Sequence, residues 1–213
     1  MTLIWIDSNT DKEMVYEFCK TSEQETRGSA GNYSVDNWEK DPSTLMYKIY
    51  KEKIYDRENR GGYAAIVDEG KILVGAGVCQ WSDDPNSCIL YSRLYSRKEA
   101  RGLPKARIIH LEFDIYDLAI ELGYRGSISS FNKYNLKLRE VTYNTNDPTR
   151  FPSYYSTDHN HHYTGPKGRR IIPAKKFEHP VKVNYVKQWL LYYAIDPSYE
   201  ADLEQLLNKL AIK

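Results

Sequence analysis

The sequence lacks the features that mark several common protein classes. Its three cysteines, Cys19, Cys79 and Cys88, form no C-x-x-C pair, which argues against a disulfide framework and a zinc site. No apolar run approaches the roughly 18 residues that a membrane helix needs, and the first residues resemble no signal peptide. These absences predict a protein of the reducing cytoplasm with no membrane partner.

The sequence also has no excess of positive or negative charge. The chain has 30 Lys and Arg residues against 29 Asp and Glu residues, a net charge of +1, so no global field would recruit nucleic acid. There is no P-loop spacing and no G-x-S-x-G element. Residues 158–162 combine Asp, Asn and His, but their spacing matches no known metal motif, and we predict no metal site.

Tyrosine is the abundant residue, with 19 copies against 5 phenylalanines. A tyrosine combines an apolar ring with a polar tip and suits half-exposed positions in grooves, interfaces and sheet edges. One hypothesis is therefore a protein-interaction subunit whose tyrosines form its interface.

Periodicity and turn residues predict an alternating order of strands and helices. The first part begins with a strand and continues with two helices separated by a polar loop. A hairpin follows, closed by Asp68-Glu69-Gly70-Lys71 with glycine where a positive φ is favourable. The predicted elements are strand 2–6, helix 11–20, loop 23–41, helix 44–58, strands 63–67 and 72–79, and, after a turn at 82–86, strand 88–96.

The second part contains the clearest helix of the chain. Apolar residues from Ile108 to Leu122 repeat at spacings of 3 and 4, which predicts one buried face, and Gly123 is a predicted C-cap. An irregular insertion at about 144–173 interrupts the predicted order. The remaining predicted elements are strand 127–131, helix 135–141, strands 181–186 and 188–195, and helix 199–211.

The connection between strand 88–96 and the long helix is rich in basic residues. It has the sequence Arg97-Lys98-Glu99-Ala100-Arg101-Gly102-Leu103-Pro104-Lys105-Ala106. A helix N-terminus beside basic side chains is a suitable site for a pyrophosphate. The spacing alone equally fits an ordinary strand–helix connection with exposed charges.

The same stretch resembles the central motif of the GNAT acyltransferases. That motif has an L-Y-V strand, a P-E-Y-R-G-type turn and a Q/R-x-x-G-x-G/A pyrophosphate loop. Matching positions here are Leu94, Tyr95, Glu99, Arg101, Gly102 and Ala106. The hairpin before the motif and Gly123-Tyr124, Ser129–Asn132 and Asn135 after it resemble the family too. The resemblance covers about residues 63–141.

The resemblance implies a fold and a set of roles. The fold would be a single mixed α/β (α+β-like) domain over residues 1–213, a GNAT-type fold with a central, mostly antiparallel twisted sheet flanked by helices. Acetyl-CoA or another acyl-CoA would be the co-substrate, with its thioester in a splayed gap between strands 88–96 and 127–131. The implied cofactor-binding residues are Leu94, Tyr95, Ser96, Arg101, Gly102, Leu103, Lys105, Ala106, Asn132 and Asn135.

Other positions depart from the family pattern. Pro104 stands where a glycine is usual and removes one N–H donor, and Ser96 replaces a small aliphatic residue. The family's thiolate-protonating tyrosine falls on Thr142, so Tyr143, one residue away, is the candidate general acid. Tyr91 and Arg93 share a strand face with Tyr95 and are candidates for the acceptor site.

The resemblance implies an N-acetyltransferase that passes an acyl group directly to a primary amine in a ternary complex. The acceptor would be a small-molecule or protein amine. The alternative is a catalytically inactive GNAT-like module that binds coenzyme A or a partner protein, which Pro104 and Thr142 favour. Strand 188–195 is a candidate for pairing between subunits, so a homodimer is a further expectation.

Overall fold

A computed structural model of the 213-residue chain describes residues 1–27, 35–81, 84–101, 103, 109–131, 175–183 and 186–211. Packing divides the chain into two compact units. Unit 1 is Met1–Ser82 with Leu90–Leu122, and unit 2 is Asp83–Ile89 with Gly123–Lys213. Strand β4 (Asp84–Ser96) contributes its first part to unit 2 and its second part to unit 1.

Unit 1 contains an antiparallel sheet whose hairpin was predicted correctly. Strand β2 (Gly62–Asp68) pairs with β1 (Thr2–Trp5) on one side and with β3 (Lys71–Trp81) on the other. The turn between β2 and β3 places Glu69 at φ 46° and Gly70 at φ 73°. Two consecutive positive φ values are the geometry of a tight hairpin turn, and glycine adopts it without a steric cost.

Glycines on β3 make room for two tyrosine rings in the core of unit 1. A Cβ at Gly75 would lie 2.6 Å from the Tyr63 ring, and one at Gly77 would lie 2.3 Å from the Tyr55 ring. The two rings meet edge to face, with their centroids 5.3 Å apart. Both tyrosines are buried, so much of the tyrosine excess here builds core.

Helix α1 (Lys12–Arg27) starts near the predicted position but is longer than predicted. The prediction ended this helix at Lys20 because the following residues are polar. The buried stripe of Val15, Phe18 and Cys19 continues to Glu23, which is only 5% exposed. The loop predicted from Glu23 was therefore wrong at its start, because packing overrides the polar composition.

Helix α2 (Leu45–Tyr50) is much shorter than the predicted helix 44–58. It begins as expected, since the Thr44 side chain accepts a hydrogen bond from the Tyr47 N–H. The chain leaves the helical conformation soon afterwards, with Lys53 at φ 52°. A separate 3-10 turn, η3 (Arg57–Asn59), follows with Asp56 as its N-cap, and another, η2 (Val35–Lys40), lies within the predicted loop.

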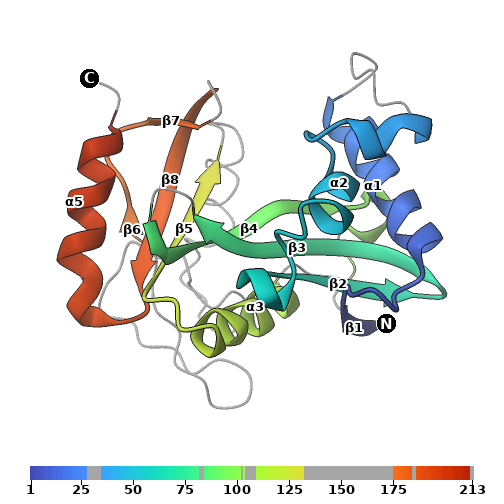
Figure 1. Ribbon diagram of the computed structural model, residues 1–213, viewed down its shortest axis with the longest axis horizontal. Helices are drawn as coiled ribbons and strands as arrows, with labels where there is room; N and C mark the ends of the chain where they lie inside the picture. The colour runs from blue at the N-terminus through green and yellow to red at the C-terminus, as the bar shows by residue number, and fades with distance from the viewer. Residues whose placement is uncertain are drawn as a thin grey trace. The chain divides into compact units, whose positions relative to one another are not determined.

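Helix α3 (Ile109–Glu121) confirms the clearest periodic prediction over its described part. Leu111, Ile115 and Leu118 are all at most 1% exposed. Gly123 follows at φ 75°, the conformation expected of a C-cap glycine. Helices α1 and α3 cover opposite faces of the strands of unit 1 (Figure 1).

Unit 2 is organised around β8 (Val186–Ala194). One edge of β8 pairs antiparallel with β5 (Gly126–Phe131), and β6 (Lys175–Lys176) and β7 (Val181–Val183) also pair with it. The predicted strand 181–186 is thus wrong at its end, since β7 ends at Val183 and the antiparallel β8 begins at Val186. Because β8 has partners within its own chain, the expected pairing between subunits gains no support from it.

Two further elements complete unit 2. The 3-10 turn η7 (Pro197–Tyr199) precedes helix α5 (Glu200–Leu210), which packs with Leu203 and Leu207 buried. The first part of β4 pairs parallel with β5, joining Ser87–Ile89 to Gly126–Ile128. Asp84–Asn86 extend β4 into the predicted turn at 82–86.

The hydrogen-bonded strand order among the described residues is β1-β2-β3-β4-β5-β8-β6, with β7 on β8. The fold class is confirmed: the strands form a mostly antiparallel sheet with one parallel pair, and helices pack against it. Among these residues no helix has the length and apolar character needed to cross a lipid bilayer. Predicted helix 135–141 and the insertion at 144–173 lie outside the described residues.

Helix α3 supplies a matched test of the unit 1 core. Leu118 is 1% exposed, whereas Ile120 on the same helix is 49% exposed. Leu118→Ala should lower the free energy of unfolding by about 2–5 kcal/mol, because its removal leaves a cavity against Gly62. Ile120→Ala should change it by no more than about 0.5 kcal/mol. Equal losses in urea unfolding would contradict this packing.

Candidate functional site

The end of β4 is held in place by Arg97. Its backbone N–H donates to the Leu73 carbonyl at 2.9 Å, and its side-chain Nε donates to the Ile72 carbonyl at 2.8 Å. A second guanidinium nitrogen lies 3.2 Å from the Thr21 hydroxyl of α1. One side chain therefore ties β4 to β3 and to α1.

Tyr95 precedes this anchor and points into the core. Its ring packs against Phe18 with centroids 5.3 Å apart, and the residue is 4% exposed. Burial, followed by the nearby Glu25 carboxylate, raises the pKa of Tyr95 above its usual range. The hydroxyl therefore keeps its proton at neutral pH. Leu94 and Ser96 are half-buried.

The chain turns after β4 through the 3-10 turn η4 (Lys98–Ala100) and exposes Arg101. The Arg101 side chain is 57% exposed and lies 3.4 Å from the Glu25 carboxylate. Its Nε and Nη2 donate to the Ser96 carbonyl at 3.3 and 3.2 Å. The guanidinium thus lies directly over the end of the strand, within reach of solvent.

Two backbone donors of this turn bond to carbonyls within the turn itself. The Arg101 N–H donates to the Lys98 carbonyl at 3.2 Å, and the Leu103 N–H donates to the Ala100 carbonyl at 3.1 Å. Both amides were expected to hold a pyrophosphate. Among the described residues of the turn, the side chains of Lys98 and Arg101 are exposed cations that can reach an anion, while Leu103 adds a 39% exposed apolar surface.

Other predicted site residues are only partly described or not described. Tyr91 and Arg93 lie on β4, as expected, but their side chains are outside the described part of the structure. The splayed gap between strands stays a prediction. The predicted site residues that lie outside the described ranges are Gly102, Lys105, Ala106, Asn132, Asn135 and Tyr143.

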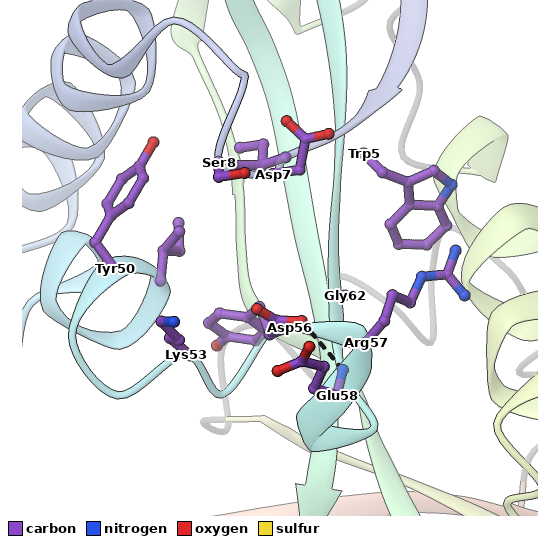
Figure 2. Close-up of a pocket in the computed structure, with 12 residues that line it drawn as sticks. Trp5, Asp7, Ser8, Tyr50, Lys53, Asp56, Arg57, Glu58 and Gly62 are labelled. Carbon is purple, nitrogen blue, oxygen red and sulfur yellow. Dashed lines mark hydrogen bonds between the residues drawn. The ribbon is translucent and has the colours of Figure 1, made fainter.

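A pocket of about 470 Å³ opens elsewhere in unit 1 (Figure 2). One side is formed by the β1–α1 loop with Asp7 and Ser8, and the other by the segment from α2 to η3 with Lys53 and Asp56. Trp5 forms a further wall. This pocket was not predicted from the sequence, because much of its second wall falls within the predicted helix 44–58.

The pocket walls are fixed by local hydrogen bonds. Asp7 accepts from the N–H groups of Asn9 and Thr10, each at 2.9 Å, and these bonds lower the pKa of its carboxyl group below the usual value. Asp56 accepts from the Glu58 N–H at 3.1 Å. These contacts close two tight turns, and the lowered pKa of Asp7 keeps its carboxyl group ionised at neutral pH.

Arg57 connects the pocket to α3. Its guanidinium lies 5.0 Å from the centroid of the Trp5 ring and 3.3 Å from the Glu121 carboxylate. Figure 2 shows the Arg57 side chain extending toward Trp5. As for metals, no group of three or more His, Cys, Asp or Glu side chains suited to an ion occurs within the described ranges, and residues 158–162 lie outside them.

Comparison with solved structures identifies the fold. The apo structure of FdhC, described as a nucleotide-linked sugar GNAT, matches with TM-score 0.55 at 10% identity, covering 99% of this chain and 94% of its own. A GNAT-family acetyltransferase from Staphylococcus aureus Mu50 matches with TM-score 0.52 at 14% identity, covering 92% and 99%. Spermidine N-acetyltransferase from Vibrio cholerae matches with TM-score 0.52 at 12% identity, covering 91% and 95%.

These likenesses confirm that the chain has the GNAT fold. No family model and no curated protein matches its sequence. At identities of 10–14% the likeness describes the fold and leaves the reaction to be argued from the site.

The two arginines at the end of β4 should differ in structural importance. Arg97→Ala should lower the free energy of unfolding by about 1.5–3 kcal/mol, because partly buried hydrogen bonds from a charged donor are lost. Arg101→Ala should change it by at most about 1 kcal/mol, since its contacts are exposed. Urea unfolding measures both, and a larger loss for Arg101→Ala would contradict the anchoring role of Arg97.

Proposed function

We propose that the protein is an acyl-CoA-dependent N-acyltransferase, in the simplest case one that transfers acetyl from acetyl-CoA to a primary amine. The observation that carries this proposal is the end of β4. There an exposed guanidinium, Arg101, stands over the strand terminus just before the long helix of a GNAT fold. A guanidinium suits the diphosphate of coenzyme A because it offers several donors and keeps its charge.

The chain's own groups would bind and position the donor. Arg101 would bind the diphosphate through its side chain, with Lys105 as a second cation. The Ser96 carbonyl now accepts from Arg101, so any bond from Ser96 to the pantetheine arm requires Arg101 to move toward the phosphate. Leu103 would contact the apolar part of the donor. Gly102, Ala106, Asn132 and Asn135 remain proposed contacts from the family resemblance.

The reaction would be direct transfer within a ternary complex. The amine nitrogen attacks the thioester carbonyl carbon, the C–S bond breaks, and the amine loses a proton while the coenzyme thiolate gains one. Tyr143 is the proposed donor of that last proton. Positioning of two substrates accounts for a large part of such a rate enhancement. Tyr95 is an unsuitable acid, because its hydroxyl lies in the core of unit 1.

The acceptor class is the most open part of the proposal. The printed names of the neighbours include spermidine for one protein and a nucleotide-linked sugar for another, so the same fold serves unlike acceptors. Under the proposed chemistry the acceptor is a primary amine of a small molecule or of a protein. Tyr91 and Arg93 on β4 remain the proposed acceptor contacts.

Thiol release from acetyl-CoA with a panel of primary amines tests the proposal. The double change Arg101→Ala with Lys105→Ala should raise the KM for acetyl-CoA at least about 10-fold, because charge-assisted contacts of about 1.5 kcal/mol or more each are lost. Lys209→Ala, an exposed change on α5, is the matched control and should leave KM unchanged.

Three outcomes would each contradict a part of this proposal. Acetyl-CoA binding without thiol release on any amine would favour the inactive coenzyme-binding module. Tyr143→Phe should lower kcat with little change in the KM for acetyl-CoA, and an unchanged kcat would remove Tyr143 from the mechanism. An unchanged KM in the double variant would place the diphosphate elsewhere.

A further inference from the structure

Helix α1 brings a carboxylate to the end of β4. Thr21 and Glu25 are four residues apart on α1, so they lie on the same face of the helix. The Thr21 hydroxyl lies 3.2 Å from the Arg97 guanidinium. One helical turn further along, the Glu25 carboxylate lies 3.4 Å from the Arg101 guanidinium. The contact at Arg97 thus holds α1 against the strand end, and Glu25 reaches the arginine of the proposed diphosphate site.

The stability of α1 alone does not explain a glutamate at this position. Helix α1 ends at Arg27, so Glu25 lies in its last turn, where the helix dipole disfavours a negative charge. The Glu25 side chain is nevertheless only 18% exposed, against 57% for the Arg101 side chain. The favourable charge contact of this half-buried carboxylate comes from Arg101.

The same contacts occupy one edge of the Arg101 guanidinium. Its Nε and Nη2 donate to the Ser96 carbonyl at 3.3 and 3.2 Å, and Nη2 also donates to the Glu25 carboxylate at 3.4 Å. Two parallel N–H donors on one edge are what a guanidinium uses to bind a phosphate group in a bidentate manner. A diphosphate on this edge has to displace Glu25, because two anions at such short range repel each other strongly.

The Tyr95 hydroxyl offers Glu25 an alternative donor. The phenol is buried, and its oxygen has no hydrogen-bond partner among the described residues. Burial, followed by the Glu25 carboxylate, raises the pKa of Tyr95, so the two groups lie close together and the phenol keeps its proton. A small movement of the Glu25 side chain lets this hydroxyl donate to its carboxylate. Glu25 can therefore release Arg101 without being left unpaired.

We propose that Glu25 is an internal competitor for the diphosphate of the acyl donor. It holds the Arg101 guanidinium at the Ser96 carbonyl, releases it when the diphosphate binds, and binds it again when the product coenzyme leaves. Glu25 thereby sets the affinity of the donor site and favours release of the product. This inference rests on the proposed function for the identity of the ligand, whereas the competition itself applies to any diphosphate at Arg101.

Isothermal titration of the full-length protein with inorganic pyrophosphate, up to millimolar concentration at low salt, tests the competition without an acyl-CoA. Glu25→Gln should tighten binding at least about 3-fold, because an ion pair and a like-charge repulsion are removed. A 3-fold effect means that Arg101 is free of Glu25 in about a third of the unchanged protein. Glu13→Gln, the same change at an exposed position in the first turn of α1, should leave the affinity unchanged.

The Arg101→Ala background shows whether Glu25 acts through Arg101. Pyrophosphate should bind this variant weakly or not at all, and the addition of Glu25→Gln should produce no tightening. Three results overturn the proposal. They are an equal or weaker affinity in Glu25→Gln, a tightening that persists in the Arg101→Ala background, and an absence of pyrophosphate binding in every variant.

The same titrations with acetyl-CoA separate this inference from the proposed function. Acetyl-CoA should bind Glu25→Gln more tightly by about the same factor as pyrophosphate, since both would use the same edge of the Arg101 guanidinium. If pyrophosphate responds as predicted while acetyl-CoA binds none of the proteins, the competition by Glu25 is confirmed and the coenzyme as its ligand is wrong.

Discussion

The end of β4 depends on the hydrogen bonds made by Arg97. The Arg97 guanidinium donates to the Ile72 carbonyl and to the Thr21 hydroxyl on α1, and the Arg97 backbone N–H donates to the Leu73 carbonyl. Because the hydrogen bonds of Arg97 hold the strand end, the position of Arg101 does not have to be fixed by buried contacts. Arg101 can therefore stay 57% exposed and still lie at a defined place, over the Ser96 carbonyl.

The strands of unit 1 separate two regions of opposite character. At one end, Arg97 and Arg101 provide positive charge beside the proposed donor site. At the other end, Asp7, Asp56 and Glu58 line a pocket with an excess of negative charge. The near-zero net charge of the chain conceals this division.

Local patterns in the sequence predicted the elements that depend on local physics. The β2–β3 hairpin follows from Gly70 in its turn, and α3 follows from an uninterrupted apolar stripe. Tertiary packing decided the elements that were missed. Glu23 is buried, so α1 continues through a polar stretch, and Lys53 adopts a positive φ, so α2 ends early.

The candidate sites show the same limit. The resemblance assigned anion binding to the backbone from Arg101 to Ala106, and the two of these amides that the structure describes, those of Arg101 and Leu103, bond within the turn. The pocket was missed because its walls come from segments about 50 residues apart, Trp5–Ser8 and Ile49–Gly62. The hydrophobic periodicity of a sequence does not show that two turns far apart in the chain face each other.

Titration of acetyl-CoA into the purified protein at low salt tests the central claim most directly. We predict micromolar binding that weakens as salt is added and is lost when Arg101 and Lys105 are both changed to alanine. Absence of binding at low salt would contradict it, and would mean that this GNAT fold serves a purpose other than holding coenzyme A.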